Sequence, residues 1–459
     1  MPRIRSLILP LLLLAAHSGP ARADALDDYL NSAMQRHRIP GLSVAVVREG
    51  KVVKAKGYGQ ANVELNVPAT EDTVYQIGSV TKQFTATALM MLVEEGKVSL
   101  DDTVTKHLSG LPEAWAGVTL RHLLTHTSGI KSYTSLPGYV TGVRNERTKE
   151  QMIAMVSTLP LEFQPGEKWN YNNTGYFLLG MVVEKASGKS YGDFLTERIF
   201  KPLEMTRTRV NDLRDVIPNR ASGYEREGDT LRNAEYVSMT QPYAAGAMVS
   251  TVTDLAKWDA ALYTEKLLKR SSLDQMWTPV KLKDGKPATY GFGWGVDTVS
   301  GHRLISHGGG IPGFTSFLAR YVDDRLTVIV LCNTMANPEA LAAGVARQYL
   351  PDLVEKPLED KEPKVTEKLR EVLTQVAEGK LDANAFTPEA RGPITAGAKG
   401  AGEFLKSLGP LKSLSLLERG TEGKNRTYRY RVLFGDNPVI IRCMITEDGL
   451  FAGLGLSPD

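Results

Sequence analysis

The chain has 459 residues, of which 42% are hydrophobic, 23% charged and 7% aromatic. This is the composition of a globular protein, and it excludes a disordered, collagen-like or disulfide-scaffolded chain. The 55 Lys and Arg residues nearly balance the 52 Asp and Glu residues, so the protein lacks the positive field that attracts nucleic acids or anionic membranes. We therefore expect no nucleic-acid partner.

Residues 1–23 have the features of a secretory signal peptide. Two early arginines precede an apolar stretch from Leu7 to Ala16, and Ala21-Arg22-Ala23 forms a small-x-small cleavage site. An uncleaved N-terminal anchor is the alternative, but the apolar stretch is too short to span about 30 Å of hydrocarbon. We expect cleavage before Asp24, a periplasmic or secreted protein, and no transmembrane span after cleavage.

The first elements after this segment are a helix, a hairpin and a second helix. Helical spacing predicts a helix at Leu26–Arg38. Two β-rich stretches, Leu42–Arg48 and Lys51–Tyr58, are separated by Glu49-Gly50 and predict a hairpin. The next helix is predicted at Ser79–Glu95.

Residues 100–262 are predicted to be mostly helical, with the most apolar helix at Thr174–Lys185. Strand patterns then return and one more helix follows; these elements are Gly291–Val299, Phe314–Tyr321, Leu326–Cys332 and the helix Pro338–Tyr349. The early hairpin and these later strands lie on either side of the helical segment in the sequence. Together they predict an α+β fold with one antiparallel β-sheet flanked by helices. The central helices would form a mostly helical lobe, with the active cleft between sheet and lobe.

A change in composition divides the chain near residue 354. Residues 354–365 form a Pro-flanked charged stretch, which predicts a linker between a main domain at 24–353 and a small C-terminal α+β domain at 366–459. The helices and strands expected in the small domain are Thr366–Glu378, a helical stretch around Gly402–Leu408, Leu411–Leu417, Arg426–Phe434 and Pro438–Ile445. The sequence leaves open whether this domain gates the cleft, mediates dimerisation or binds cell-wall material.

The two cysteines, Cys332 and Cys443, both lie in apolar, strand-like stretches. A disulfide could form in an oxidising compartment, but we expect two separate buried thiols.

Ser79-Val80-Thr81-Lys82 is the strongest chemical signal. If Ser79 opens a helix, Lys82 lies on the same face one turn along. The hydroxyl would then sit at the positive end of the helix dipole with an amine within reach, and both features favour a developing alkoxide. Ser-x-x-Lys alone is a weak signal, because an N-cap serine followed by a surface lysine gives the same pattern.

Tyr171-Asn172-Asn173 is the second signal. It precedes the helix predicted at Thr174–Lys185, and residues on such a loop are free to point into a cleft. A phenol has a pKa of about 10, so Tyr171 could act as a base only if nearby cations such as Lys82 held its phenolate. The alternative is a turn-forming asparagine pair beside a half-buried tyrosine.

His307-Gly308-Gly309-Gly310 is the third signal. Glycines at the edge of a strand let a substrate backbone approach closely and leave N–H groups unobstructed. One such N–H, paired with that of Ser79, could form an oxyanion hole, and His307 would add a polar or cationic group. A glycine-rich turn with an incidental histidine is the alternative.

The order of these three signals resembles that of the penicillin-recognising serine hydrolases. The resemblance is to the branch with class C β-lactamases, D-alanyl-D-alanine carboxypeptidases, D-aminopeptidases and esterases. Other segments resemble the same family over about residues 26–350; they are Leu123–Ile130 (Leu-Leu-Thr-His-Thr-Ser-Gly-Ile), Phe163–Gly166, Gly175–Gly180 and Pro202–Met205. The resemblance implies a β-lactamase/penicillin-binding-protein-like hydrolase with the α+β fold of that family.

The resemblance also implies the catalytic roles. Ser79 would be the nucleophile and Lys82 a partner in its deprotonation. Tyr171 would be the general base and would later protonate the leaving group, although the sequence leaves open whether Tyr171 or Lys82 takes the proton of Ser79. No metal or organic cofactor is implied.

The implied substrate-binding residues are Asn173, His307, Gly308 and Gly309, and the implied oxyanion hole is formed by the N–H groups of Ser79 and Gly310. Asn173 would position both the substrate amide and Lys82. His307 stands where many relatives have a lysine, which removes a fixed positive charge that would hold a β-lactam carboxylate. We therefore expect peptidase or esterase activity rather than efficient antibiotic hydrolysis, with covalent trapping by penicillin still open.

Two further patterns carry less weight. His122 and His126 are four residues apart, as in zinc-binding helices, but the Glu of His-Glu-x-x-His is missing, so a structural role is predicted. Thr127-Ser128-Gly129 lacks the Gly-x-Ser-x-Gly pattern of a nucleophile elbow.

The leading functional hypothesis is a secreted hydrolase that cleaves an amide or ester through an acyl-enzyme on Ser79, with peptides of D-amino acids as substrates. A carboxylesterase of the same fold is the alternative among enzymes. A catalytically silent protein that binds peptidoglycan stems is the alternative outside them. The intact triplet argues against the silent protein, because a binding protein needs neither Lys82 nor Tyr171.

Overall fold

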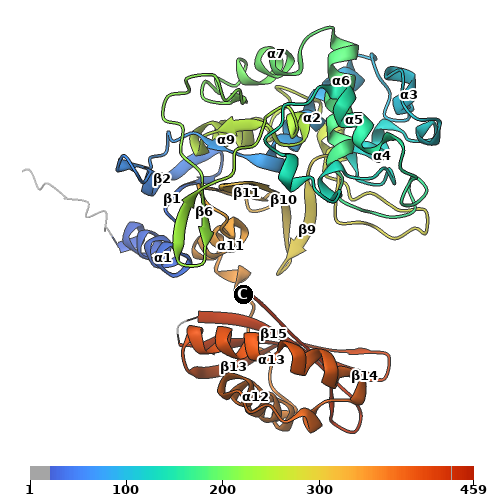
Figure 1. The fold of residues 1–459 in the computed structure, drawn as a ribbon. Coiled ribbons are helices and arrows are strands. Elements are labelled where there is room, and N and C mark those ends of the chain that lie inside the picture. Colours follow the sequence, from blue (N-terminus) through green and yellow to red (C-terminus); the bar gives the residue numbers. More distant parts are fainter. Residues whose placement is uncertain (1–20, 436, 459) are drawn as a thin grey trace, which may run out of the picture. The chain divides into compact units, whose positions relative to one another are not determined.

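The computed structural model describes residues 21–435 and 437–458. The first 20 residues of the predicted signal peptide lie outside the described residues. The chain divides into two compact units, one formed by residues 1–297 and 303–348 and the other by residues 298–302 and 349–459 (Figure 1). Within the described ranges, no helix combines the length and apolar character needed to cross a bilayer.

A seven-stranded sheet organises the first unit, in the order β3-β2-β1-β12-β11-β10-β9. Strand β1 (Gly41–Arg48) pairs antiparallel with β2 (Lys51–Asn62) on one side and with β12 (Leu326–Cys332) on the other. The remaining strands are β3 (Val67–Pro68), β9 (Gly295–Val299), β10 (His302–Ile311) and β11 (Phe314–Tyr321). Strands from both ends of the unit therefore share one sheet, and the predicted α+β fold is confirmed.

Helices cover both faces of this sheet. In Figure 1, α1 (Ala21–His37) and α11 (Pro338–Tyr349) lie on one side, and α9 (Val252–Ala261) and the helical lobe lie on the other. Helix α9 packs directly on β1 and β12. The shorter helices of the unit are α3 (Val104–His107), α4 (Leu120–Leu124), α5 (Lys149–Ser157), α7 (Tyr191–Leu195), α8 (Tyr243–Gly246) and α10 (Arg270–Met276). Its short strands are β4 (Tyr75–Gln76), β5 (Arg209–Val210), β6 (Tyr224–Glu227), β7 (Thr230–Asn233) and β8 (Met248–Ser250).

Two buried helices form the centre of the lobe. Helix α2 (Thr81–Glu94) is apolar around most of its circumference and is buried from Thr81 to Leu92. It packs against α6 (Asn173–Ser187), which begins where the Asn172 side chain accepts a hydrogen bond from the Gly175 N–H and ends at the left-handed Gly188. These caps fix where each end of α6 lies, and the N-terminal cap places Tyr171 and Asn173 beside α2.

A buried ion pair joins the sheet to α9. Arg320 on β11 and Asp259 on α9 are both almost fully buried, with Nε 2.6 Å from Oδ1. Thr327 donates to the same carboxylate oxygen, and the guanidinium lies 4.7 Å from the centroid of the Tyr263 ring. A charged group so far from water is tolerated only with its partner in place.

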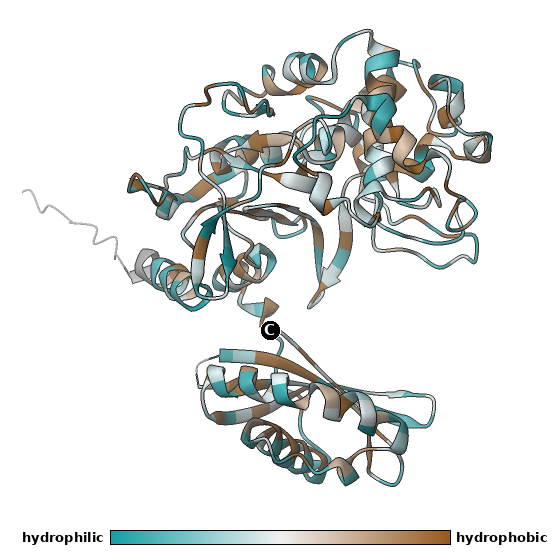
Figure 2. Ribbon diagram, in the orientation of Figure 1, coloured by the Kyte–Doolittle hydropathy of each residue, from teal (hydrophilic) through white to brown (hydrophobic). Residues whose placement is uncertain are grey.

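The second unit is a four-stranded antiparallel sheet with two helices on one face. Its strands are β13 (Leu411–Glu422), β14 (Asn425–Phe434), β15 (Asn437–Ile445) and β16 (Phe451–Pro458), and its helices are α12 (Pro363–Glu378) and α13 (Pro388–Leu408). Helix α12 carries both hydrophobic and hydrophilic residues (Figure 2), and its buried side chains, at Leu369, Val372, Leu373 and Val376, recur with helical spacing. They pack on β14 and β15 side chains such as Tyr430 and Ile441.

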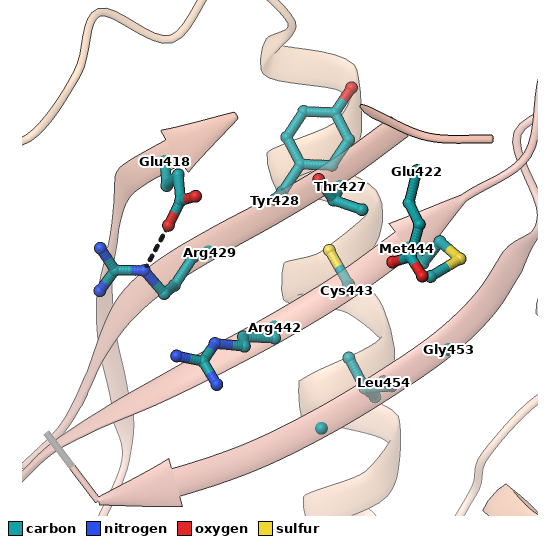
Figure 3. Close-up of a pocket in the computed structure, with 11 residues that line it drawn as sticks. Glu418, Glu422, Thr427, Tyr428, Arg429, Arg442, Cys443, Met444, Gly453 and Leu454 are labelled. Atoms are coloured by element: carbon teal, nitrogen blue, oxygen red, sulfur yellow. Dashed lines mark hydrogen bonds and ion pairs between the residues drawn. The ribbon is translucent and has the colours of Figure 1, made fainter. Parts of the chain in front are cut away.

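The opposite face of this second sheet is largely polar. It carries a shallow pocket of about 420 Å³ whose lining includes Glu418, Arg429, Arg442 and Met444 (Figure 3). Arg429 pairs with Glu418 at 3.0 Å and with Glu355 at 2.5 Å, so its charge is compensated within the unit.

Four element predictions need correction. Helix α12 begins at Pro363, inside the predicted linker, and α13 begins at Pro388 rather than near Gly402. Strand β16 was not predicted, because glycines occupy alternate positions in it. Strand β9 begins at Gly295 rather than Gly291, because the backbone turns at Gly293, where φ is +77° and a side chain would meet the Lys82 carbonyl.

Both cysteines are free thiols, as predicted. Cys332 ends β12 in the first unit, and Cys443 lies on β15 in the second. Burial raises the pKa of each thiol to about 12, so neither is a thiolate at neutral pH.

The buried ion pair gives a test of how the sheet is held to the lobe. Asp259→Leu should lower the free energy of unfolding by about 3–5 kcal/mol, because it leaves the Arg320 charge buried without a partner. The measurement is urea unfolding of the full chain. Arg270→Ala, which breaks an exposed pair with Asp274, should cost no more than about 1 kcal/mol, and equal effects of the two variants would contradict this role for Asp259.

Candidate active site

Ser79 lies on a single 3₁₀ turn, Gly78–Val80, that leads directly into α2. Backbone contacts hold the turn, since the Ile77 N–H donates to the Met248 carbonyl and Ser316 Oγ donates to the Ile77 carbonyl at 2.8 Å. Ser79 caps no backbone N–H of this turn. The N-cap interpretation of the Ser-x-x-Lys pattern is therefore wrong for this chain.

Lys82 is fully buried, and its amine faces Ser79. Its Nζ lies 3.0 Å from Ser79 Oγ, 2.8 Å from Asn173 Oδ1 and 2.7 Å from the Ala245 carbonyl oxygen. Burial lowers the pKa of this amine well below its usual value. An uncharged amine has two N–H groups, and the amide and carbonyl oxygens can only accept them, so its lone pair is left facing the Ser79 hydroxyl.

Tyr171 meets the same hydroxyl from the loop before α6. Its phenol is hydrogen-bonded to Ser79, and the Lys82 amine lies 4.9 Å from the centroid of its ring. Burial raises the pKa of Tyr171 above its usual value, because a phenolate would be poorly solvated there. The expectation that a charged Lys82 holds Tyr171 as a phenolate is thus not supported, since burial favours the neutral form of both groups.

Asn173, the first residue of α6, orients Lys82. Its Oδ1 accepts from the amine, its Nδ2 donates to Thr134 Oγ1 at 3.1 Å, and its backbone N–H donates to Ser132 Oγ at 3.2 Å. The neighbouring Asn172 is the helix cap instead. The two asparagines therefore differ in role, and of the two only Asn173 is hydrogen-bonded to Lys82.

His307 lies within β10, and it is buried. Its Nδ1 is 2.6 Å from the Gly308 carbonyl oxygen and its Nε2 is 2.7 Å from the Tyr290 hydroxyl. Burial, with a smaller effect of Lys82, lowers the pKa of His307 to about 3. A carbonyl only accepts, so the single proton of the neutral ring is on Nδ1 and Nε2 accepts from Tyr290. His307 is thus a polar group without charge.

The glycines of β10 let this strand approach the Ser79 turn. A side chain at Gly309 would place its Cβ 2.0 Å from the Ile77 carbonyl oxygen, and one at Gly78 would meet the Gly310 nitrogen at 2.8 Å. Gly308 is less confined, because a Cβ there would meet the Phe317 ring at 3.3 Å. The backbone of Gly310 therefore lies beside the Gly78–Ser79 peptide, as the predicted oxyanion hole requires.

Sequence reasoning missed one residue of this cluster, Tyr290, and gave another, His126, only a structural role. Tyr290 is fully buried and hydrogen-bonds His307, but it lies just before the predicted strand Gly291–Val299 and belongs to none of the three chemical signals. His126 is also fully buried, and the centroid of its ring lies 4.3 Å from the centroid of the Tyr171 ring. The sequence signals for His126 were its spacing from His122 and the family-like segment Leu123–Ile130, and neither pointed to a contact with Tyr171.

The spacing of His122 and His126 reflects backbone hydrogen bonding. The Nδ1 of His122 accepts from the Thr119 N–H in the capping box of α4, and the Nδ1 of His126 accepts from the Asn172 N–H at 3.1 Å. Both contacts agree with the predicted structural role of the pair.

Comparison with known proteins places this site in a family. The family model described as Beta-lactamase matches residues 26–351. Penicillin-binding protein 4* of Bacillus subtilis is 33% identical over 66% of this chain and 70% of its own length. The chain covers 64 to 70% of the length of such curated relatives.

Two solved structures are similar over different extents. The octameric penicillin-binding protein homologue from Pyrococcus abyssi is 26% identical, with a TM-score of 0.64, and the match covers 95% of this chain and 98% of that one. D-amino acid amidase from Ochrobactrum anthropi SV3 is 28% identical, with a TM-score of 0.62, over 73% of this chain and 97% of that one. The first of these matches extends through both units.

Fold and site together define a serine hydrolase of the β-lactamase and penicillin-binding-protein type. The chain belongs to the Beta-lactamase family.

The tautomer and charge of His307 can be tested directly. Because its pKa is lowered to about 3, its imidazole should stay neutral, with the proton on Nδ1, between about pH 5 and 8. The measurement is ¹⁵N NMR of histidine-labelled full-length protein, with the urea-unfolded chain as the control in which this ring titrates near its ordinary value of about 6.5. Titration of His307 near 6.5 in the folded protein would contradict this account.

Proposed function

We propose that this protein is a periplasmic or secreted serine hydrolase that cleaves an amide or ester bond next to a D-amino acid, through an acyl-enzyme on Ser79. The observation that carries the proposal is the buried Lys82 amine 3.0 Å from Ser79 Oγ. An amine with a lowered pKa is the base that a serine hydroxyl needs near neutral pH. The signal-like residues 1–23 support the location.

In the first step, Ser79 Oγ forms a bond to the substrate carbonyl carbon and its proton passes to the neutral Lys82. As the tetrahedral species collapses, the bond to the leaving group breaks and the Tyr171 phenol gives its proton to that group. The raised pKa of Tyr171 in the free protein supports this order, because it keeps the phenol protonated and able to act as an acid. Lys82 is then an ammonium and Tyr171 a phenolate, and each stabilises the other.

In the second step, water replaces the leaving group. The Tyr171 phenolate takes a proton from the attacking water, whose oxygen bonds to the acyl carbon. The bond to Ser79 Oγ then breaks, and the Lys82 ammonium returns a proton to that oxygen. Both side chains end in the neutral forms in which they began, so the cycle needs no other reactant.

Backbone N–H groups would stabilise the negative charge that develops on the carbonyl oxygen. The proposed donors are the N–H groups of Ser79 and Gly310, whose peptides are held together because neither Gly78 nor Gly309 has a side chain. Asn173 would act through Lys82, because its amide group is already bonded on both sides.

The uncharged His307 favours some substrates over others. Without a positive charge at this position, the strand offers a free carboxylate only hydrogen bonds, which argues for amides and esters rather than β-lactams. Solved structures similar to this chain include a D-stereospecific amidohydrolase from Streptomyces and the D-amino acid amidase, and these support D-amino-acid amides as the first substrates to test. A carboxylesterase remains the second candidate, because the same neutral cleft accepts short acyl esters.

The role of Lys82 can be tested by covalent labelling. Lys82→Met should slow phosphonylation of Ser79 by a fluorophosphonate probe, in which Oγ bonds to phosphorus and fluoride leaves, about 10²–10⁴-fold, because it removes the base and keeps a side chain of similar length. The measurement is the second-order labelling rate at pH 7, with Ser79→Ala as the unlabelled baseline.

Lys257→Met is the matched control, since this lysine is half-exposed on α9 and pairs with Asp254; its labelling rate should equal that of the wild type. A loss of less than tenfold in Lys82→Met would assign the base role to Tyr171. Labelling that persists in Ser79→Ala would refute the proposed nucleophile.

A further inference from the structure

We infer that His126 is a positioning residue for Tyr171: it brackets the tyrosine with two hydrogen bonds and packs its ring against the phenol. This inference rests on the proposed function, because it concerns the group that would protonate the leaving group. It assigns a chemical purpose to a buried histidine that the mechanism itself does not use.

The two hydrogen bonds lie on either side of Tyr171 in the sequence. The His126 carbonyl oxygen accepts from the Asn170 N–H at 2.9 Å, and its Nδ1 accepts from the Asn172 N–H at 3.1 Å. One residue thus fixes the Trp169–Asn170 peptide and the Tyr171–Asn172 peptide, which lie on either side of the tyrosine. Few other contacts could define the direction of the phenol as closely, because Tyr171 lies on a loop rather than within a helix.

Ring packing fixes the remaining freedom of the phenol. The imidazole centroid lies 4.3 Å from the Tyr171 ring and 4.6 Å from the Tyr290 ring, with 47° between planes in each case. The Tyr171 ring is therefore in contact with the His126 ring, and the Lys82 amine lies 4.9 Å from the centroid of the same ring. Both neighbours limit how far the phenol can turn. Tyr290 in turn hydrogen-bonds His307, so the same layer of rings reaches β10.

Two local costs show that this histidine is not simply a hydrophobic filler. Its backbone has φ of +60°, which residues with a side chain rarely adopt. Its Nε2 has no hydrogen-bond partner in the part of the chain that the structure describes, although the side chain is fully buried. A phenylalanine would avoid the second cost but could not accept from Asn172, so the acceptor at Nδ1 is the feature that a histidine supplies here.

The bracket needs a neutral imidazole, because a protonated Nδ1 would be a donor facing the Asn172 N–H. Burial, the largest cause, lowers the pKa of His126 well below its usual value. The acceptor is therefore present throughout the neutral pH range.

Leaving-group chemistry provides the test. An ethyl ester has a leaving group that needs a proton, whereas a p-nitrophenyl ester of the same D-amino acid does not. The value of kcat/KM reports acylation alone for both substrates. His126→Leu should therefore lower kcat/KM about 10–100-fold for the ethyl ester, the cost of a misplaced catalytic group, but less than about threefold for the p-nitrophenyl ester.

Two further variants and one control keep the test sharp. His126→Asn should recover most of the ethyl ester rate, because asparagine tolerates positive φ and offers an oxygen near the position of Nδ1. His126→Gly removes the acceptor without a penalty at positive φ and should behave like His126→Leu if the latter does not fold. Leu341→Ala, a core variant of α11 on the sheet, should lower the melting temperature without changing the ratio of the two esters.

A double variant distinguishes positioning from general damage. Tyr171→Phe should itself reduce the ethyl ester rate selectively, and adding His126→Leu to it should cost less than about twofold more. Equal losses on both esters, no recovery in His126→Asn, or additive losses in the double variant would overturn the inference. If Ser79→Ala stays active, or the wild type hydrolyses neither ester, the proposed function fails as well.

Discussion

The burial of one amine governs the chemistry of this protein. Lys82 lies on a helix that is enclosed by other elements along almost its full length, and the cost of keeping a charge there lowers the pKa of the amine. Two oxygens that can only accept hold the amine in place and leave its third position to Ser79. In the proposed mechanism, the Ser79 hydroxyl, a weak nucleophile, thereby obtains its base from within the helical lobe.

Packing of the other elements of the first unit holds these side chains in place around Ser79. The sheet brings β10 against the turn that carries Ser79, and this approach is possible only because Gly309 and Gly78 have no side chains. The capped start of α6 delivers Asn173 to Lys82 and places Tyr171 one loop residue away. Segments distant in sequence thus meet at one hydroxyl because packing, rather than local propensity, fixes each of them.

Much of the fold follows from sequence pattern alone. Alternating and continuous apolar stretches located β11, β12 and α11 at their observed bounds. Helix α13 was predicted too short because Pro393 disfavours a helix, and strand β16 was missed because the glycines at 453 and 455 disfavour a strand. In both elements tertiary packing overrides the local propensity. The triplet around Ser79 could be found from spacing, but the neutral state of Tyr171 could not, because it depends on burial. Tyr290 was missed, and the contact of His126 with Tyr171 could not be predicted, for the same reason: these roles arise from contacts between distant segments.

The pKa of Lys82 in the full-length protein tests the central claim most directly. It can be measured by ¹⁵Nζ NMR of lysine-labelled protein, with the resonance assigned by its absence in Lys82→Met. The account predicts an amine that titrates well below the ordinary lysine value of 10.5. A Lys82 side chain that is still a charged ammonium at pH 9 would contradict it.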